Sequence, residues 1–411
     1  MSKFNVYKEI ISSKNIEAAY FNTLSKFEAQ QKTNSYKGLD GLSFVNSYIN
    51  LLDLIDKIQK EMVHLNPVNP AIKILIPKQN KPGDRTIFIH TIKERIKSQA
   101  IYQVIYPIIE KELSNFLFSY RSSHPHYKAA QGVARRYRKK YTSDYVLIGD
   151  ISDYCDNINK EILKNKFIEI GFDNETIKLI NLFIDNEYFE KGTKQKLSKG
   201  LVHGEPLISI FYNLYINDID KFVGKKVSLY RRVGDDFILL DSNLKKIKGM
   251  RDYIVEALEK NEIPGDKQKI KIHKLSENFK FLGYDFNNGL ISISKPSVQK
   301  IKKRWRNLLR FYSTKKTLRE RIFFQKSKQA NYEFLEIIKH YSQINNYNQI
   351  KNLSDYFFIR LTIYLFGQYN DKNRRKTEKK FRDNGYFSLY DVFLRVKSGK
   401  SYEIKKIMKT K

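Results

Sequence analysis

Cysteine is almost absent from this sequence, and its absence excludes several kinds of site. Among 411 residues the one cysteine is Cys155, so the chain forms no internal disulfide and no zinc site built from cysteine pairs. A lone thiol is typical of proteins in reducing compartments. The first residues, MSKFNVYKEI, also lack the basic segment followed by an apolar one that marks a secretion signal. We therefore expect a cytoplasmic protein.

Acidic residues and long apolar runs are scarce as well. The sequence has 44 Asp and Glu against 76 Lys and Arg, a formal net charge of +32. No apolar run approaches the roughly 20 residues that span a bilayer, so we expect no membrane-spanning segment. A chain this basic attracts polyanions, and its 28 Tyr and 27 Phe offer stacking surfaces for bases, although many must belong to the core. Nucleic acid is the expected partner, with an anionic membrane surface as the alternative.

The spacing of apolar residues predicts an α+β protein. Helices are expected over 42–62, 91–117, 160–188, 244–260 and the basic region after 297, and another helix follows the glycine-bearing turn at 199–206. Strand pairs are expected over three stretches: 71–89, 227–241 and 278–294. No low-complexity linker or internal repeat separates these elements, so we expect one multi-lobed enzyme.

Two adjacent acids at a turn between apolar strands are the sharpest local feature. They are Asp235 and Asp236 in the segment VGDDF, and Asp150 ends another apolar strand, DYVLIGDIS. Neighbouring carboxylates repel each other, and a bound divalent cation would relieve that repulsion. If the two strands lie side by side in one sheet, the three carboxylates converge. A solvated hairpin turn is the alternative, because Gly-Asp is common in turns.

Converging carboxylates suit Mg²⁺, which prefers oxygen ligands and binds through one or two carboxylates plus substrate phosphates. Two such ions, roughly 3.5–4 Å apart, assist an in-line displacement at phosphorus by activating a 3′-hydroxyl and steadying the leaving pyrophosphate. Asp150, Asp235 and Asp236 are therefore candidate catalytic residues and metal ligands of a nucleotidyltransferase.

Several motifs in a fixed order resemble those of reverse transcriptases, particularly the prokaryotic branch related to group II intron, retron and abortive-infection enzymes. Within residues 70–295, IPKQNKPGDRTIFI resembles the fingers hairpin and GDISDYCDNI the first palm motif. KGLVHGEPLISIFYNLYI resembles the second palm motif, and YRRVGDDFILL the Tyr-x-Asp-Asp motif. GDKQKIKIHKLSENFKFLGYDF resembles the closing lysine motif and the primer grip.

The resemblance implies roles for individual residues. Lys78 and Arg85 would hold the nucleoside triphosphate, and Gly204 would lie against the base pair. Lys267 would neutralise or protonate the leaving pyrophosphate, with Lys269 as the close alternative. Each residue also has an alternative explanation without function. Lys78 and Arg85 could be exposed charges on a hairpin, Gly204 could start a helix, and Lys267 could be a surface lysine.

The sequence departs from the family pattern at three of these motifs. Val233 replaces the aromatic residue before the acid pair, and His203 replaces a glutamine. Cys155 stands where the family has Phe or Tyr beneath the sugar of the incoming nucleotide. The family's ring excludes a 2′-hydroxyl by steric clash, so the small cysteine predicts relaxed discrimination against ribonucleotides, unless Tyr154 fills the same space.

The resemblance further implies a right-hand polymerase fold with Mg²⁺ as cofactor. We expect N-terminal helices and fingers in 1–140, a palm with an antiparallel sheet in 141–295, and a basic helical thumb or C-terminal lobe in 296–411. After residue 300 the sequence shows no nuclease finger, no RNase H carboxylate set and no integrase-like region. This favours the retron and defence-associated enzymes, which implies anti-phage function with a dedicated non-coding RNA as template or scaffold.

The first hypothesis is therefore an RNA-directed DNA polymerase that uses an RNA template and nucleoside triphosphates and makes a DNA product. A homo-oligomer or a companion protein is compatible with it. An untemplated or protein-primed polymerase of the abortive-infection type is the second hypothesis, and product attached to protein would identify it. The third is a catalytically silent RNA-binding scaffold, against which the intact acids argue. A group II intron maturase is a fourth hypothesis, weakened by the missing C-terminal parts.

Overall fold

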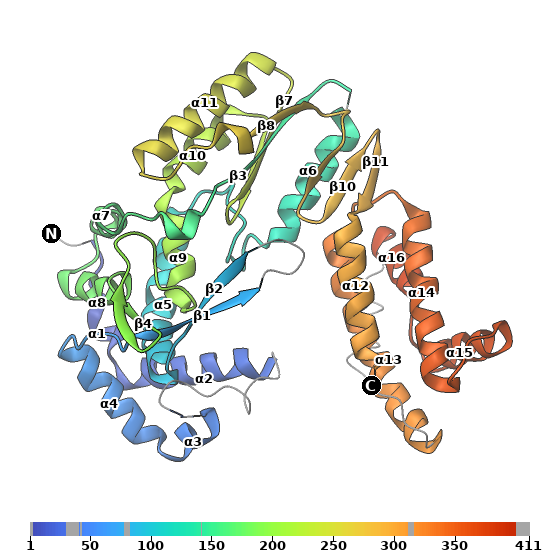
Figure 1. Cartoon of the computed structure of the whole chain (residues 1–411), viewed down its shortest axis with the longest axis horizontal. Coiled ribbons are helices and arrows are strands. Elements are labelled where there is room, and N and C mark those ends of the chain that lie inside the picture. Colours follow the sequence, from blue (N-terminus) through green and yellow to red (C-terminus); the bar gives the residue numbers. More distant parts are fainter. Residues whose placement is uncertain are drawn as a thin grey trace. The chain divides into compact units, whose positions relative to one another are not determined.

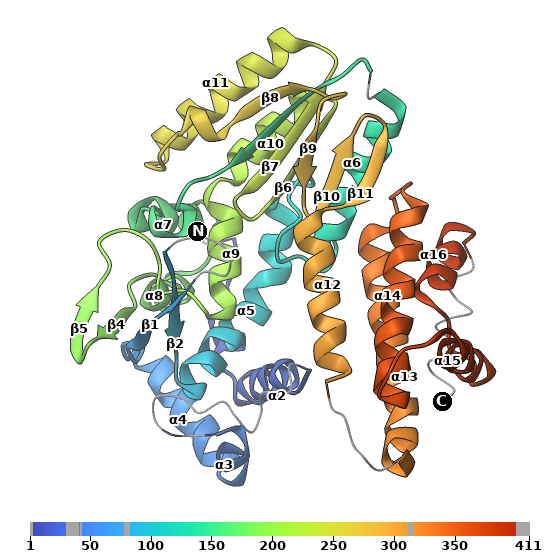
Figure 2. The same cartoon turned by 45° about the vertical axis from the view of Figure 1, so that its right-hand side comes forward.

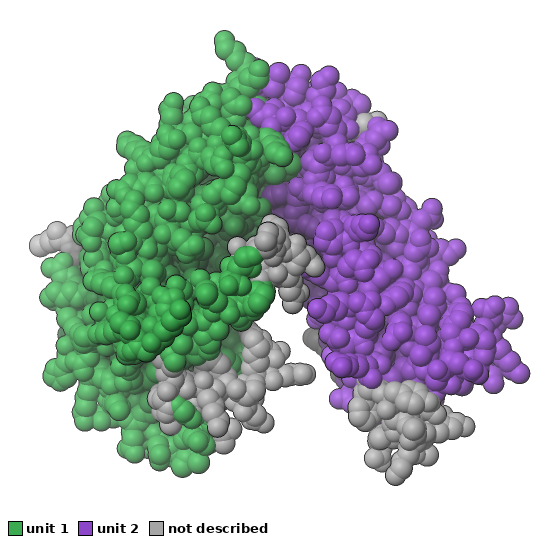
Figure 3. Space-filling model, viewed as in Figure 1, with its two compact units in different colours: residues 1–124, 147–239, 245–271 green, residues 125–146, 240–244, 272–411 purple. Residues whose placement is uncertain are grey.

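The computed structural model describes residues 3–29, 41, 43–77, 83–140, 142–310 and 316–399. These residues form helices and separate, mostly antiparallel sheets, which confirms the predicted α+β class. The chain divides into two compact units, coloured separately in Figure 3. The first unit comprises Met1–His124, Leu147–Leu239 and Lys245–Lys271, and the second comprises Pro125–Val146, Leu240–Leu244 and Ile272–Lys411. No helix in the described part of the chain combines the length and apolar character that a bilayer crossing requires.

The first unit is built around a long central helix, α5 (Ile92–Glu112), against which α2 and α9 pack (Figure 1). Helix α5 begins where the Thr91 side chain accepts a hydrogen bond from the backbone amide of Glu94, a standard N-cap. The other helices of this unit are α1 (Tyr7–Ile10), α2 (Ser13–Ala29), α3 (Phe44–Ile49), α4 (Leu51–Val63), α7 (Lys160–Ile170), α8 (Asn174–Ile184), α9 (Pro206–Tyr215), α10 (Asn217–Lys226), α11 (Leu244–Lys260) and the short 3₁₀ turns η1 (Tyr154–Asp156) and η2 (Lys267–Lys269).

One sheet of the first unit has the strand order β2-β1-β4-β5. Its strands are β1 (Ala71–Pro77), β2 (Asp84–Ile89), β4 (Glu187–Glu190) and β5 (Thr193–Lys196). Strands β1 and β2 pair antiparallel from Ile72 opposite Ile89 to Pro77 opposite Asp84, which confirms the predicted hairpin. One face of this sheet is sealed by a buried apolar cluster: Ala71, Phe88, Tyr188 and Val202. The segment before α9 is thereby held against β2.

The predicted acid-bearing strands are neighbours in a second sheet. It contains β6 (Leu229–Val233), β7 (Asp236–Asp241) and β3 (Tyr145–Asp150) in the order β6-β7-β3. Gly149 allows β3 and β7 to approach closely, because a Cβ at this position would lie 2.2 Å from the Phe237 ring. Such a distance is far inside van der Waals contact, so any larger residue would push the strands apart next to Asp150.

The second unit is mainly helical, and α12, α13 and α14 run side by side (Figure 2). Its helices are α6 (His126–Lys140), α12 (Lys295–Leu308), α13 (Lys316–Tyr341), α14 (Tyr347–Phe366), α15 (Asp371–Asp383) and α16 (Leu389–Lys397). Its strands are β8 (Lys271–Lys274), β9 (Phe279–Phe281), β10 (Tyr284–Asn287) and β11 (Leu290–Ile293). The predicted hairpin at Asn288 and Gly289 is confirmed by the antiparallel pairing of β10 with β11. Trp305 is fully buried between Phe334 and Phe357, so this tryptophan is a core residue.

Candidate active site

A buried ion pair supports the turn that carries the adjacent acids. Arg232 on β6 is fully buried, and its guanidinium binds the Asp220 carboxylate of α10 through contacts of 2.7 and 2.8 Å. The same guanidinium donates a hydrogen bond of 2.9 Å to the carbonyl oxygen of Gly234, the first residue of the turn. The Tyr230 hydroxyl also donates to Asp220. Helix α10 thus fixes the backbone from which Asp235 and Asp236 project.

Two of the three predicted metal ligands lie close together. The backbone amide of Ile151 donates to the carbonyl oxygen of Asp235 at 3.0 Å, which places the end of β3 beside the turn. Burial raises the pKa of Asp235, and the negative charge of Asp150 raises it further. The two carboxylates are therefore near enough for their charges to repel each other. Asp236 is exposed at the first position of β7.

The donor chemistry of these acids fits Mg²⁺, although they do not form a closed cage. Among the residues that the structure describes, no three His, Cys, Asp or Glu side chains come close enough to hold a metal ion by themselves. Mg²⁺ does not require such a cage, because it binds through one or two carboxylates and completes its shell with phosphate oxygens and water. The electrostatic repulsion at Asp150 and Asp235 is relieved by a divalent cation.

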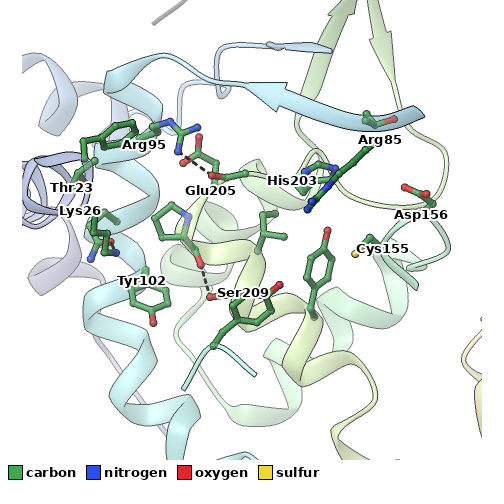
Figure 4. Close-up of a pocket in the computed structure, with 18 of the residues that line it drawn as sticks. Thr23, Lys26, Arg85, Arg95, Tyr102, Cys155, Asp156, His203, Glu205 and Ser209 are labelled. Atoms are coloured by element: carbon green, nitrogen blue, oxygen red, sulfur yellow. Dashed lines mark hydrogen bonds between the residues drawn. The ribbon is translucent and has the colours of Figure 1, made fainter. Parts of the chain in front are cut away.

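A cavity of about 830 Å³ lies in the first unit (Figure 4), and Asp150, Asp235 and Asp236 are not among the residues that line it. In Figure 4, Arg85, His203, Cys155 and Asp156 gather at one end, and Lys26, Arg95 and Tyr102 line the other. Of the four residues predicted to contact the nucleotide, Arg85, Cys155 and Gly204 line this cavity. Lys78 lies outside the described residues.

Electrostatic coupling links the cavity to the acids. Tyr120, which the sequence did not single out, lines the cavity and has a left-handed backbone with φ of 54°. Partial desolvation raises the pKa of Tyr120, Cys155 and Asp235 raise it further, and Arg85 lowers it. Tyr120 is thus electrostatically coupled to Asp235 and to Arg85. Burial also raises the pKa of the Cys155 thiol to about 11, so the thiol is protonated at neutral pH.

The space beside Cys155 is not filled by Tyr154. Tyr154 is buried, and its hydroxyl donates to the backbone carbonyl of Tyr212 at 2.5 Å, away from the cavity lining. Tyr212 on α9 lines the cavity instead, as Cys155 does. The sequence does not reveal that Tyr212, and not Tyr154, lies at the cavity, because an aromatic ring at either position fits a core.

Position 204 requires glycine because of its backbone conformation and because of the atoms that surround it. Its φ is +117°, and a Cβ would lie 3.2 Å from the Phe88 carbonyl oxygen and 3.4 Å from the His90 ring. The Arg95 guanidinium donates to the Gly204 carbonyl oxygen at 3.1 Å. Backbone, rather than a side chain, therefore forms this part of the cavity wall.

Lys267 does not reach the cavity. It lies in η2, and its ammonium is 3.8 Å from the Asp252 carboxylate of α11, with both side chains largely exposed. Lys269 ends the same 3₁₀ turn and is also exposed.

Comparisons with known proteins agree with the motif order. The reverse transcriptase (RNA-dependent DNA polymerase) family matches residues 76–286, slightly more than half of the chain. The group II intron-encoded protein LtrA of Lactococcus lactis subsp. cremoris is 23% identical over 198 residues, covering 44% of this chain and 32% of LtrA. LtrA from strain MG1363 of the same organism aligns with the same figures. The alignment thus spans about a third of the length of these relatives. On the family match, the chain belongs to the reverse transcriptase family.

Proposed function

We propose that this protein is an RNA-directed DNA polymerase that adds nucleotides to a 3′-hydroxyl with Mg²⁺ as cofactor. The observation that carries the proposal is that Arg85, Cys155 and Gly204, from three separate segments, line one cavity. That cavity is coupled to Asp235, because the Asp235 charge acts on both Cys155 and Tyr120. Membership of the reverse transcriptase family supports the same activity.

In this mechanism each part of the cavity has one task. Asp150, Asp235 and Asp236 would hold Mg²⁺, which when bound lowers the pKa of the attacking hydroxyl and stabilises charge on the transferred phosphoryl group. The Arg85 guanidinium binds phosphate oxygens of the nucleotide, where its planar donors match them in pairs. The Gly204 backbone lets the new base pair approach the wall closely.

The role of Lys267 in protonating pyrophosphate belongs to the same proposal. Its contact with Asp252 joins exposed groups 3.8 Å apart. Surface pairs of this kind contribute only about 0–1 kcal/mol, so the ammonium is free to leave Asp252 when a triphosphate binds.

The wider setting is also proposed. A right-hand layout would place the fingers in 1–140, the palm in 141–295 and the thumb in 296–411. The retron-like and abortive-infection-like motifs support a role in bacterial anti-phage defence with a dedicated non-coding RNA, and the net charge of +32 supports binding to that RNA. A cytoplasmic location and a homo-oligomer or companion protein complete the proposal.

A protein-primed polymerase is the second candidate, and Tyr120 favours it. Its side chain is 59% exposed, and its hydroxyl lies within the electrostatic reach of Asp235. A tyrosine hydroxyl in that position can replace a 3′-hydroxyl as the first acceptor. Product that stays attached to denatured wild-type protein but not to Tyr120→Phe would establish this route, and detachable product from both would exclude it.

The test compares the wild type with the Asp235→Asn/Asp236→Asn double variant. Both are purified with any nucleic acid that accompanies them and are supplied with Mg²⁺ and each labelled nucleotide in turn. Incorporation by the wild type alone supports the polymerase, and sequencing of the bound RNA and the product identifies the template. Asp218→Asn is the control, because this exposed acid pairs with Lys166 and lies outside the cavity. No incorporation by the wild type, with one specific RNA still bound, would favour the scaffold.

A further inference from the structure

Two fully buried ionisable side chains meet at the cavity wall, one of them from the lining residue Glu205, and the proposed chemistry uses neither. His90 follows β2 and Glu205 precedes α9, and their side chains are 0% and 1% exposed. Glu205 occupies the N-cap position of α9 but makes no capping hydrogen bond, although Ser, Thr, Asp or Asn would make one there. A buried acid that does not cap its helix needs another reason for its place.

The hydrogen-bond geometry defines how protons are distributed in the pair. Nε2 of His90 lies 3.0 Å from the backbone carbonyl oxygen of His203, and a carbonyl oxygen can only accept, so Nε2 carries a proton. Nδ1 of His90 lies 3.0 Å from Oε1 of Glu205, and this contact needs a second proton. The contact of His90 with the His203 carbonyl and the contact of His90 with Glu205 each need one proton. Loss of either proton breaks the corresponding contact.

Burial favours the uncharged form of both side chains, so that one proton stays on His90 and one on Glu205. Burial lowers the pKa of His90 to about 3, while the His203 carbonyl raises it and the Arg95 charge lowers it. Burial raises the pKa of Glu205 to about 7, and Arg95 lowers it. The α9 N-terminus favours an anion, but this stabilisation is smaller than the cost of burying an unpaired carboxylate. Below about pH 7 Glu205 is therefore mainly a neutral acid, and its Oε1 lies 3.0 Å from Nδ1 of a neutral His90.

The pair acts on a stretch of backbone that lines the cavity. His203 and Gly204 are both lining residues, and the Gly204 carbonyl is held from the other side by Arg95. The His90 ring also packs where a Gly204 Cβ would lie. The charged and titratable groups that face the pair are Arg95 from α5 and His203 from the wall itself.

We propose that Glu205 and His90 form a neutral positioning pair that holds the His203–Gly204 wall in its nucleotide-binding shape, and that ionisation of Glu205 releases it. This inference rests on the proposed polymerase function. A released wall binds nucleotide less tightly but leaves the acids and their chemistry unchanged, so the effect falls on KM and not on kcat. As pH rises through about 7, Glu205 loses its proton, and the 3.0 Å contact between Glu205 and His90 loses the proton that lies between the two atoms.

The decisive variant is Glu205→Gln, because its amide donates to Nδ1 of His90 but does not titrate. With a primer–template and a deoxynucleoside triphosphate, the wild-type KM is expected to rise about three- to tenfold between pH 6 and pH 8.5, the loss of one hydrogen bond. The Glu205→Gln KM is expected to match the wild type at pH 6 and to stay flat. Glu262→Gln is the matched control, since this exposed acid pairs with Lys199 outside the cavity and should keep the wild-type profile.

Nitrogen-15 spectra of the histidines give a readout that does not depend on turnover. At pH 6 we expect His90 to be neutral with its proton on Nε2, in both the wild type and Glu205→Gln. A positively charged His90, or a Glu205→Gln variant that is folded but has lost nucleotide binding at pH 6, would overturn the pair. Parallel pH profiles for the wild type and Glu205→Gln would overturn it too. Absence of polymerisation with the expected His90 spectrum would instead contradict the polymerase.

Discussion

Cys155 is the residue at which this site departs furthest from the family pattern. It lines the cavity with its thiol beside the Tyr212 hydroxyl, and Tyr154 lies in the core. We expect the wild type to accept ribonucleotides. Cys155→Phe is expected to lower kcat/KM for ribonucleotides about tenfold or more relative to deoxynucleotides, because a ring there clashes with a 2′-hydroxyl. Steady-state incorporation of each labelled nucleotide measures this ratio.

Tyr154→Phe is the control for that experiment. It removes a hydroxyl that bonds within the core and should leave the sugar preference unchanged. Strict rejection of ribonucleotides by the wild type would show that the space at Cys155 does not set sugar choice.

Substitution of Gly149 tests whether the spacing between β3 and β7 controls the positions of Asp150 and Asp235. Gly149→Ala places a Cβ 2.2 Å from the Phe237 ring. Overpacking of this kind costs about 1–3 kcal/mol and shifts backbone, so we expect a lower free energy of unfolding and a lower kcat. Urea denaturation and single-nucleotide incorporation measure the two effects.

Gly249→Ala is the matched glycine substitution. Gly249 lies in α11 with no atom within 4 Å of an added Cβ, so alanine should stabilise the helix by about 0.5–1 kcal/mol and leave kcat unchanged. If Gly149→Ala kept the wild-type kcat, the spacing between β3 and β7 would not affect catalysis.

A site residue could be predicted from the sequence when the residues next to it in the chain already indicate its role. An acid at the end of an apolar strand is visible within a few residues, so Asp150 and Asp235 could be named from sequence. The pairing of His90 with Glu205 could not, because their positions are distant in the chain and only the packing of β2 against α9 joins them. The one local signal, an acid directly before Pro206, indicates a helix start and not a buried partner.

At the scale of elements, α10 supports the turn that carries Asp235 through the ion pair of Asp220 with Arg232. Asp220→Ala leaves the fully buried Arg232 guanidinium without its carboxylate. Breaking a buried pair in this way costs about 3–5 kcal/mol, so we expect a large loss of stability in urea denaturation. We also expect weak activity, because the Gly234 carbonyl loses its fixed donor.

Asp218→Ala on the same helix provides the comparison. Its side chain is 74% exposed where it pairs with Lys166, so its loss should cost less than about 1 kcal/mol. Equal effects of the two alanine variants would mean that α10 does not anchor the turn through this ion pair.

Elements with their own apolar pattern were predictable, and those defined by a distant partner were not. Residues 244–260 were predicted as a helix and form α11 over the same range. The β4–β5 hairpin was missed, because EYFEKGTKQK has no strict apolar alternation and is largely charged. Its first strand exists because it pairs in parallel with β1, a contact that the local sequence does not contain.

At the scale of the whole molecule, the order of motifs predicted which segments of the chain lie together. It did not predict how the chain divides into two compact units. Each compact unit draws on three separate ranges of the chain. Charge is likewise a property of the whole chain, and its net value of +32 predicted polyanion binding without saying which surface binds. The structure supplies candidate surfaces because it shows which cations are exposed together.

Helix α15 carries the clearest of these surfaces outside the family-matched region. Its buried face holds Thr377 and Phe381. The opposite face carries five exposed cations, namely Lys372, Arg375, Lys376, Lys379 and Arg382. Arg374, by contrast, is held by ion pairs to Asp355 and Glu378. An exposed row of cations along about 15 Å of helix is suited to follow a phosphate backbone.

The salt dependence of RNA binding measures how much this face contributes to the whole. Each phosphate contact adds about 0.7–0.9 to the slope of log affinity against log salt. We expect the triple variant Lys372→Gln/Lys376→Gln/Lys379→Gln to reduce that slope by about two to three relative to the wild type. Lys245→Gln/Lys248→Gln/Lys260→Gln on α11 removes the same total charge from another exposed helix. An equal change in both triple variants would mean that RNA senses only the net charge of the chain, whereas a change confined to α15 would assign it direct phosphate contacts.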